Sequence, residues 1–123
     1  LQKEGVPIAL ATSSVESRAR MILDSNGILS LFDHLVFAKD VKRSKPYPDI
    51  FLKACSDLIV LPENCLVLED SEAGIEAASR AGIPVICIPD LKIPAQSFLN
   101  KTEQVFQDLD AVRDYLESKK EVF

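Results

Sequence analysis

The stretch LVLEDSEAGIEAASRAG, residues 66–82, joins a short apolar run, two adjacent acids and a small-residue helical pattern. The run CLVLE (65–69) is almost entirely apolar until its last residue, as expected of a strand that is covered on both faces. Glu69 and Asp70 close this run, and Gly82 ends the helical pattern that follows. Because two neighbouring carboxylates repel each other, a positive group is expected beside them. The stretch therefore predicts a strand, a turn and a helix, with an acidic pair at the carboxyl end of the strand.

Short apolar runs alternate with helical patterns along the rest of the chain, which is typical of βαβ units and a parallel sheet. The other expected strands are PIALA (7–11), HLVFA (34–38) and PVICI (84–88). QVF (104–106) is expected as a short edge strand. The pattern predicts an α/β fold with a parallel sheet.

Helices are expected between these strands. Ser13 and Glu16 have the spacing of a capping box, and Pro48 is expected as the first residue of the second helix. The inner face of that second helix is expected to consist of apolar residues, namely Phe51, Leu52, Cys55, Leu58 and Ile59. The third helix has a stripe of alanines at positions 73, 77 and 81, and the last helix is expected at about 108–119, after a loop from Pro89 to Lys101.

Composition narrows the class of protein. The chain has 123 residues, of which 47% are hydrophobic and 27% charged, as in one globular domain. The net charge of −5 and the absence of a basic stripe argue against nucleic-acid binding, and no run reaches the roughly 20 apolar residues of a membrane helix. Cys55, Cys65 and Cys87 lie in apolar runs, which indicates reduced thiols in a cytoplasmic protein. His34 is the single histidine, so a metal site built from several histidines is excluded.

Candidate site residues follow the predicted strands, and the carboxyl ends of parallel strands are where an open α/β sheet binds ligands. Thr12 and Ser13 follow the first strand, Lys45 follows the second at some distance, and Glu69 and Asp70 end the third. Each has a simpler interpretation: a helix N-cap, a surface lysine and an acidic helix start. Together, a hydroxyl, an ammonium group and a carboxylate pair at one edge match a site for phosphate and Mg²⁺.

Three motifs carry a family resemblance. The order LATSS (10–14), SKPYPDIF (44–51) and VLEDSEAGIEAASRAGI (67–83) resembles the haloacid dehalogenase superfamily, and most of all its β-phosphoglucomutase-like phosphatases and mutases. The resemblance covers roughly residues 5 to 90. It implies a three-layer, Rossmann-like α/β core with a parallel sheet, and a Mg²⁺-dependent phosphohydrolase that acts through an aspartyl-phosphate.

The resemblance also implies roles for individual residues. Thr12 would bind the transferring phosphoryl group, with Ser13 beside it, and Lys45 would steady the same phosphate and the nucleophile. Asp70 would bind Mg²⁺, and Glu69 would either bind the metal or support its ligands. By the same resemblance, the substrate would be a small phosphorylated metabolite such as a sugar phosphate.

The sequence departs from the family at one motif. The family's nucleophile and acid–base residue come from an Asp-x-Asp motif at the end of the central strand, and the cap that selects the substrate follows it. The Asp-x-Asp of this chain, Asp108-Leu109-Asp110, sits at the start of a late helix. Residues 1–123 are thus expected to be the C-terminal portion of a core domain, lacking its central first strand and the cap. We expect the chain alone to be inactive, and a missing N-terminal segment or a second copy to complete its sheet.

Alternative functions remain at this point. A β-phosphoglucomutase-type phosphomutase would share the same motifs, and a truncated core could serve a non-catalytic role. A receiver domain uses similar residues, but its acid pair precedes its hydroxyl and lysine along the chain, whereas here the acid pair comes last. The receiver domain is therefore disfavoured.

Overall fold

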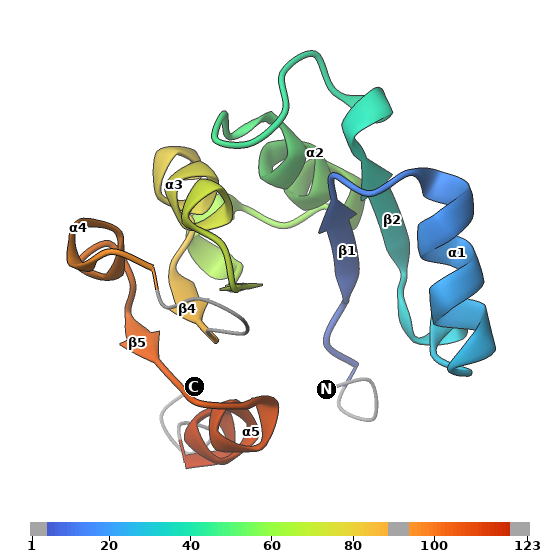
Figure 1. Ribbon diagram of the computed structural model, residues 1–123. Coiled ribbons are helices and arrows are strands. Elements are labelled where there is room, and N and C mark those ends of the chain that lie inside the picture. Colours follow the sequence, from blue (N-terminus) through green and yellow to red (C-terminus); the bar gives the residue numbers. More distant parts are fainter. Residues whose placement is uncertain (1–4, 89–93, 119–123) are drawn as a thin grey trace.

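The computed structural model describes residues 5–88 and 94–118 and shows an α/β arrangement (Figure 1). The strands are β1 (Ala9–Thr12), β2 (His34–Phe37), β3 (Val67–Glu69), β4 (Val85–Cys87) and β5 (Gln104–Val105). The α-helices are α1 (Glu16–Ser25), α2 (Asp49–Leu58), α3 (Glu72–Ala81), α4 (Gln96–Leu99) and α5 (Leu109–Ser118). Short 3₁₀ turns lie at Leu29–Leu31, Ala38–Asp40 and Pro62–Asn64. Each strand overlaps the apolar run that predicted it.

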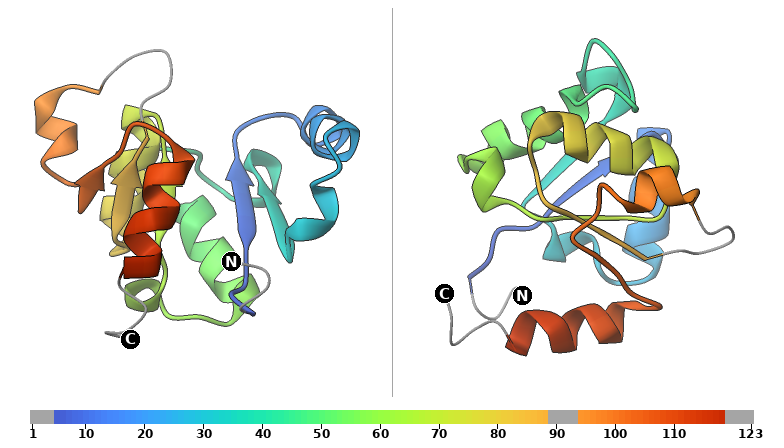
Figure 2. Two further views of the ribbon diagram at one scale, coloured as in Figure 1. Left: turned by 90° about the horizontal axis from the view of Figure 1, so that it is seen from below. Right: turned by 90° about the vertical axis from the view of Figure 1, so that its left-hand side faces the viewer.

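The strands form two separate parallel sheets. β1 pairs with β2, with Ala9 opposite His34, whereas β3, β4 and β5 pair in that order, with Val67 opposite Val85. Among the described residues, no strand ladder joins β1 to β3. Figures 1 and 2 show β1 and β2 on one side of the molecule and β4 and β5 on the other. This is the incomplete sheet that the absence of a central strand predicts.

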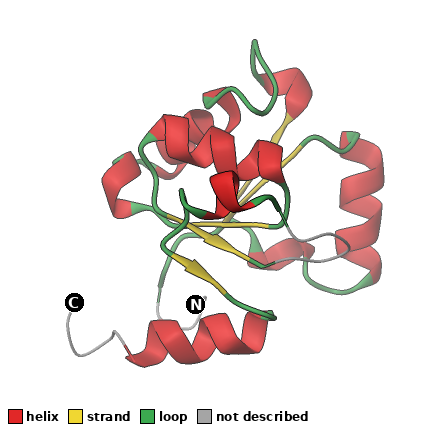
Figure 3. Ribbon diagram, turned by 60° about the vertical axis from the view of Figure 1, so that its left-hand side comes forward, coloured by secondary structure: helices red, strands yellow, loops and turns green. Residues whose placement is uncertain are grey.

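Helices cover the strands from two sides. α2 lies against β1, β2 and α3, and α3 in turn contacts β3, β4 and α4. Figure 3 shows these helices on one side of the strands and α5 on the other, which gives three layers. The apolar core between them includes fully buried Val36, Ile50, Ile75 and Val85. No helix of the described residues has the length and apolarity needed to cross a bilayer.

Two expected helix starts differ from the structure. α1 begins after Val15, which caps it without a side-chain hydrogen bond, so the capping box of Ser13 and Glu16 is wrong. Glu16 is the first residue of α1 rather than its third, and its carboxylate forms ion pairs with Arg20 and Lys39. Pro48 is the N-cap of α2 rather than its first helical residue.

The expected inner face of α2 is correct in part. Phe51 and Cys55 are buried one turn apart, but Leu52 is 40% exposed because the next residue of a helix is rotated by about 100°. Ile59 is 91% exposed and has a left-handed backbone (φ 58°) as the C-cap of α2. The chain leaves the helix there, so the side chain of Ile59 turns away from the core.

The remaining elements refine the sequence analysis. In α3 the buried small residues are Gly74, Ala77, Ala78 and Ala81, whereas Ala73 is exposed. The segment from Pro89 to Lys101 contains helix α4, so its interpretation as a loop is wrong, although residues 89–93 lie outside the described part of the chain. The last predicted helix is present as α5, and Lys119 lies outside the described residues.

Candidate functional site

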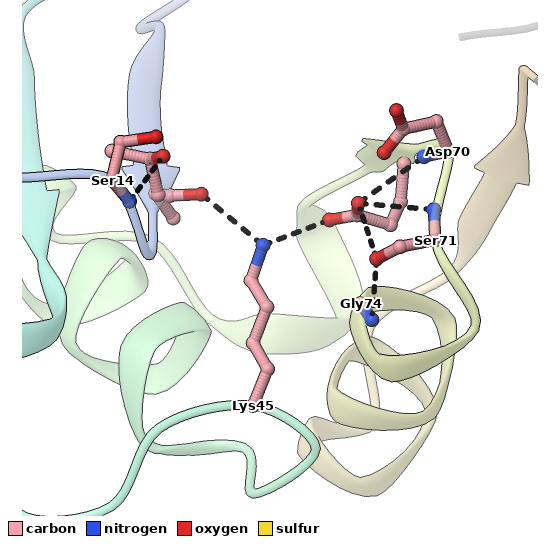
Figure 4. Close-up of polar contacts among 8 residues, drawn as sticks. Ser14, Lys45, Asp70, Ser71 and Gly74 are labelled. Atoms are coloured by element: carbon pink, nitrogen blue, oxygen red, sulfur yellow. Dashed lines mark hydrogen bonds and ion pairs between the residues drawn. The ribbon is translucent and has the colours of Figure 1, made fainter. Parts of the chain in front are cut away.

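The carboxyl ends of β1 and β3 are joined by one lysine from the loop before α2 (Figure 4). The Lys45 ammonium group donates to the Glu69 carboxylate, with 3.0 Å between Nζ and Oε2, and to the Ala11 carbonyl at 3.4 Å. The side chains of Lys45 and Glu69 are only 13% and 10% exposed. Lys45 is therefore the positive group expected beside the acidic pair, and it bridges the two sheets.

The loop and α2 hold Lys45 in place. Its Nζ lies 5.0 Å from the centre of the Phe51 ring, an arrangement in which the ring face attracts the cation. The Lys45–Pro46 peptide bond is cis, and the Tyr47 amide donates to the Ser44 carbonyl at 3.0 Å. The ammonium group is thus fixed from three directions, by the ring, a carbonyl and a carboxylate.

The second oxygen of Glu69 binds the turn that follows β3. Oε1 accepts from the backbone N–H groups of Asp70 (3.2 Å) and Ser71 (3.3 Å) and from the Ser71 hydroxyl (3.0 Å). Burial by itself raises the pKa of Glu69, but the charge of Lys45 and these hydrogen bonds outweigh it and lower the pKa below its ordinary value. Glu69 is therefore held as a carboxylate.

Gly74 is a residue that the sequence analysis missed. A β-carbon added at Gly74 would lie 2.0 Å from the Cδ atom of Glu69, so only glycine leaves room for that side chain. The Gly74 amide also donates to Oγ of Ser71, the N-cap of α3, at 3.0 Å. The sequence did contain a sign of this role, because a glycine inside a helix destabilises it by about 1 kcal/mol relative to alanine. Such a glycine indicates a close contact that a side chain would prevent.

Asp70 occupies the outer side of the same turn. It is exposed, and Figure 4 shows its side chain on the side of the turn away from Ser71 and Gly74. Glu69 is mostly buried, and its two carboxylate oxygens bind Lys45 and the turn. Of the two acids, Asp70 is the one whose carboxylate faces outward at the edge.

Glu69 and Asp70 offer carboxylate oxygens, which are a ligand type that Mg²⁺ prefers. Within the described residues, no group of three or more His, Cys, Asp or Glu side chains could hold a metal ion. Mg²⁺ commonly takes one or two carboxylates and completes its shell with phosphate oxygens and water. Asp70 fits as one such carboxylate, and Glu69 fits a supporting place behind it.

Thr12 and Ser13 lie at the neighbouring strand end. Thr12 is half-buried and its Oγ1 accepts from the Ser14 amide at 3.1 Å, whereas Ser13 is exposed and borders a shallow groove beside α1. Lys45 reaches the carbonyl of Ala11, the residue before Thr12. The structure thus brings the end of β1 at Thr12, the Lys45 ammonium group and the acidic pair to one edge, whereas Ser13 faces the groove beside α1.

The Asp-x-Asp sequence lies apart from this edge. Asp108 Oδ1 accepts from the Ala111 amide at 2.9 Å, which is the hydrogen bond of a helix cap at the start of α5. This pair of acids therefore has a local structural role, as its sequence context predicted.

Comparison with known proteins gives a consistent family. The family model for haloacid dehalogenase-like hydrolases matches residues 1–88. The validoxylamine A 7'-phosphate phosphatase of Streptomyces hygroscopicus subsp. limoneus is 39% identical over 113 residues, which are 92% of this chain and 52% of that protein. The fructose-1-phosphate phosphatase of Escherichia coli is 39% identical over 80 residues, covering 65% of this chain and 43% of that enzyme.

Solved structures agree with the sequence relatives. A β-phosphoglucomutase from Clostridium difficile superimposes with a TM-score of 0.80 at 28% identity, over 96% of this chain and 50% of that chain. A HAD phosphatase from Thermococcus onnurineus has a TM-score of 0.82 at 26% identity, over 94% of this chain and 53% of that chain. This chain spans about half the length of the proteins it matches.

Proposed function

This chain belongs to the haloacid dehalogenase-like hydrolases, and we propose that it forms the C-terminal part of the core of a Mg²⁺-dependent phosphohydrolase. The substrate we propose is a small phosphorylated metabolite, in particular a sugar phosphate, because relatives are named as phosphatases of such compounds. The observation that carries the proposal is the Lys45 ammonium group, which is held between Ala11, the neighbour of Thr12, and Glu69.

Each residue at the edge has a chemical task in this proposal. The Thr12 hydroxyl and the backbone N–H groups near Ser13 bind the phosphoryl oxygens at the start of α1. Lys45 offsets negative charge on the transferring phosphate, and its fixed position means that little reorganisation is needed. Glu69 orients the Lys45 ammonium group.

Asp70 is the residue we assign to Mg²⁺, with Glu69 supporting the turn that carries it. When bound, the metal would offset charge on the phosphoryl oxygens. The aspartate nucleophile and its acid–base partner would come from outside this chain, as would the cap that selects the substrate.

A phosphomutase is the second candidate, because β-phosphoglucomutases are among the similar structures. The same edge would bind the phosphate in both cases, and a residue outside this chain would decide between water and a sugar hydroxyl as acceptor. A truncated core with a non-catalytic role is a third candidate, and a cytoplasmic location is proposed for any of these functions.

The test compares two forms of the protein. The 123-residue chain is assayed with p-nitrophenyl phosphate and Mg²⁺, first alone and then together with the segment encoded upstream of it. We expect no turnover by the chain alone and Mg²⁺-dependent turnover by the combination. Turnover by the chain alone would refute the external nucleophile, and an inactive combination that binds neither phosphate nor Mg²⁺ would favour the non-catalytic core.

A further inference from the structure

Two cysteines lie in contact on the side of the core away from Lys45. Cys55 is in the last turns of α2, Cys65 precedes β3, and their sulfur atoms are 3.3 Å apart. Cys55 is buried and Cys65 is half-buried, and both are free thiols. Neither residue belongs to the phosphate edge, so the pair has no part in the function proposed above.

The hydrogen bonds of the pair distinguish the two sulfurs. The Cys55 thiol donates to the sulfur of Cys65, and the Cys65 thiol donates to the Leu61 carbonyl at 3.4 Å. Burial, together with the bond to Cys65, raises the pKa of Cys55 to about 12. Cys55 is therefore a poor first nucleophile, whereas Cys65 is the sulfur that a reagent in solution can reach.

The backbone holds the two sulfurs together. After α2, the Val60 amide donates to the Cys55 carbonyl at 3.0 Å, and after the Pro62–Asn64 turn the Cys65 amide donates to the Pro62 carbonyl at 3.1 Å. A disulfide bond has a length of about 2 Å, so the sulfurs need to approach by only about 1 Å. Each thiol is thus preorganised to meet the other.

We propose that Cys55 and Cys65 are a redox-active thiol pair that small disulfide compounds, such as glutathione disulfide, convert into a reversible intrachain disulfide. The Cys65 thiolate attacks one sulfur of glutathione disulfide, which forms a mixed disulfide and releases one glutathione thiolate. Cys55 then gives up its proton and attacks the Cys65 sulfur, which releases the second glutathione. The protein loses two protons and two electrons, and glutathione disulfide gains both as it becomes two glutathione thiols.

The bridge would connect α2 to the strand that ends at Glu69. α2 also carries Phe51, whose ring contacts Lys45. Oxidation would therefore tie the helix that supports Lys45 through Phe51 to the strand that carries Glu69, from the opposite end of that strand.

The experiment uses the 123-residue chain, reduced and then incubated with glutathione disulfide. Remaining thiols are alkylated and the protein is cleaved after glutamate, because Glu63 lies between the two cysteines. We expect two thiols to be lost per chain, one intrachain link between the peptides of Cys55 and Cys65, and full recovery by dithiothreitol. Three alkylated cysteines, a link to Cys87 or a disulfide-linked dimer would overturn the proposal.

Variants test the order of the two steps. Cys55→Ser is expected to accumulate glutathione on Cys65, because the second thiol is missing, and Cys55→Ala repeats the test if serine disturbs folding. Cys65→Ser is expected to take up no glutathione at the buried Cys55. Cys87→Ser is the matched control and should form the bridge as the parent chain does. Glutathione on Cys55 in the Cys65→Ser chain, with far-ultraviolet circular dichroism unchanged, would contradict the assignment.

Discussion

Lys45 and Glu69 form an ion pair of 3.0 Å although they are 24 residues apart in the sequence. Lys45 lies in the loop before α2, and Glu69 is the last residue of β3. Glu69 ends a strand of the three-stranded sheet, and Lys45 also reaches β1 of the two-stranded sheet through the Ala11 carbonyl. Both side chains are largely shielded from water. Removing either member would leave a shielded charge without its partner, which costs far more than losing a surface pair.

Replacing Lys45 is therefore expected to affect both stability and activity. Lys45→Met should lower the free energy of unfolding of the chain by roughly 2–4 kcal/mol, because the Glu69 carboxylate loses its cation. Urea denaturation measures this change, and Lys42→Met, at an exposed position, is the control.

In the catalytically complete protein, Lys45→Ala should lower kcat/KM by on the order of 10²-fold or more, as expected for a lost electrostatic donor. Lys42→Ala should have little effect. A larger loss at Lys42 than at Lys45 would contradict the role assigned to Lys45.

Glu69 should make the stability of the chain depend on pH in the acid range. Its pKa in the folded chain is below the ordinary value of 4.5, so the folded state favours the carboxylate more than the unfolded state does. The resulting stabilisation is present above pH 4.5 and is lost as the pH falls through the lower pKa of the folded state.

Thermal unfolding between about pH 7 and pH 3 measures this linkage. The difference in Tm between the parent chain and Glu69→Gln should shrink towards the acid end, whereas exposed Glu63→Gln should follow the parent throughout. A constant difference between the parent and Glu69→Gln would show that the charge of Glu69 does not stabilise the fold.

Gly74 should tolerate alanine only when Glu69 is shortened. Gly74→Ala places a β-carbon on the Glu69 side chain and should cost about 1–3 kcal/mol, despite the better helix propensity of alanine. In a Glu69→Ala background the same change should cost little or become stabilising. Equal costs in the two backgrounds, measured by urea denaturation, would mean that the close approach is not what requires glycine.

Asp70 and Glu72 should differ in their effect on Mg²⁺ activation. In the complete enzyme, Asp70→Asn should raise the Mg²⁺ concentration needed for half-maximal activity by roughly tenfold or more, because a charged ligand is lost. Glu72→Gln is the control, since the Glu72 carboxylate accepts from the Ala95 amide at 3.0 Å, between α3 and α4. Equal shifts for both variants would contradict the assignment of Asp70.

Local features of the sequence were enough to predict most elements. The strands were predictable because buried parallel strands are short and almost continuously apolar, as β2 and β4 are. The cap role of Asp108 also depends on neighbours within one helical turn. Such features need no knowledge of distant residues.

In α2, the local sequence pattern was not enough to predict which apolar side chains are buried. Its apolar residues do not all face the core, because the helix ends at Leu58 and Ile59 turns outward. Alanine periodicity in α3 likewise failed to single out Gly74, because the requirement for glycine comes from the side chain of Glu69 and not from the helix. The contact of Cys55 with Cys65 depends on the turn that returns the chain from α2 to β3.

The sequence by itself determined the parallel α/β class, the positions of the strands and the residues that reach the carboxyl edge. These follow from apolar periodicity and from the rule that parallel strands end together. Only the tertiary structure decided which of those residues touch: Lys45 binds Glu69 and the carbonyl before Thr12, and Asp70 is left on the outer side. The interaction between two charges weakens over a few ångströms, so contact depends on the exact distance between the side chains. The packing of α2 against α3 sets the distance between Lys45 and Glu69.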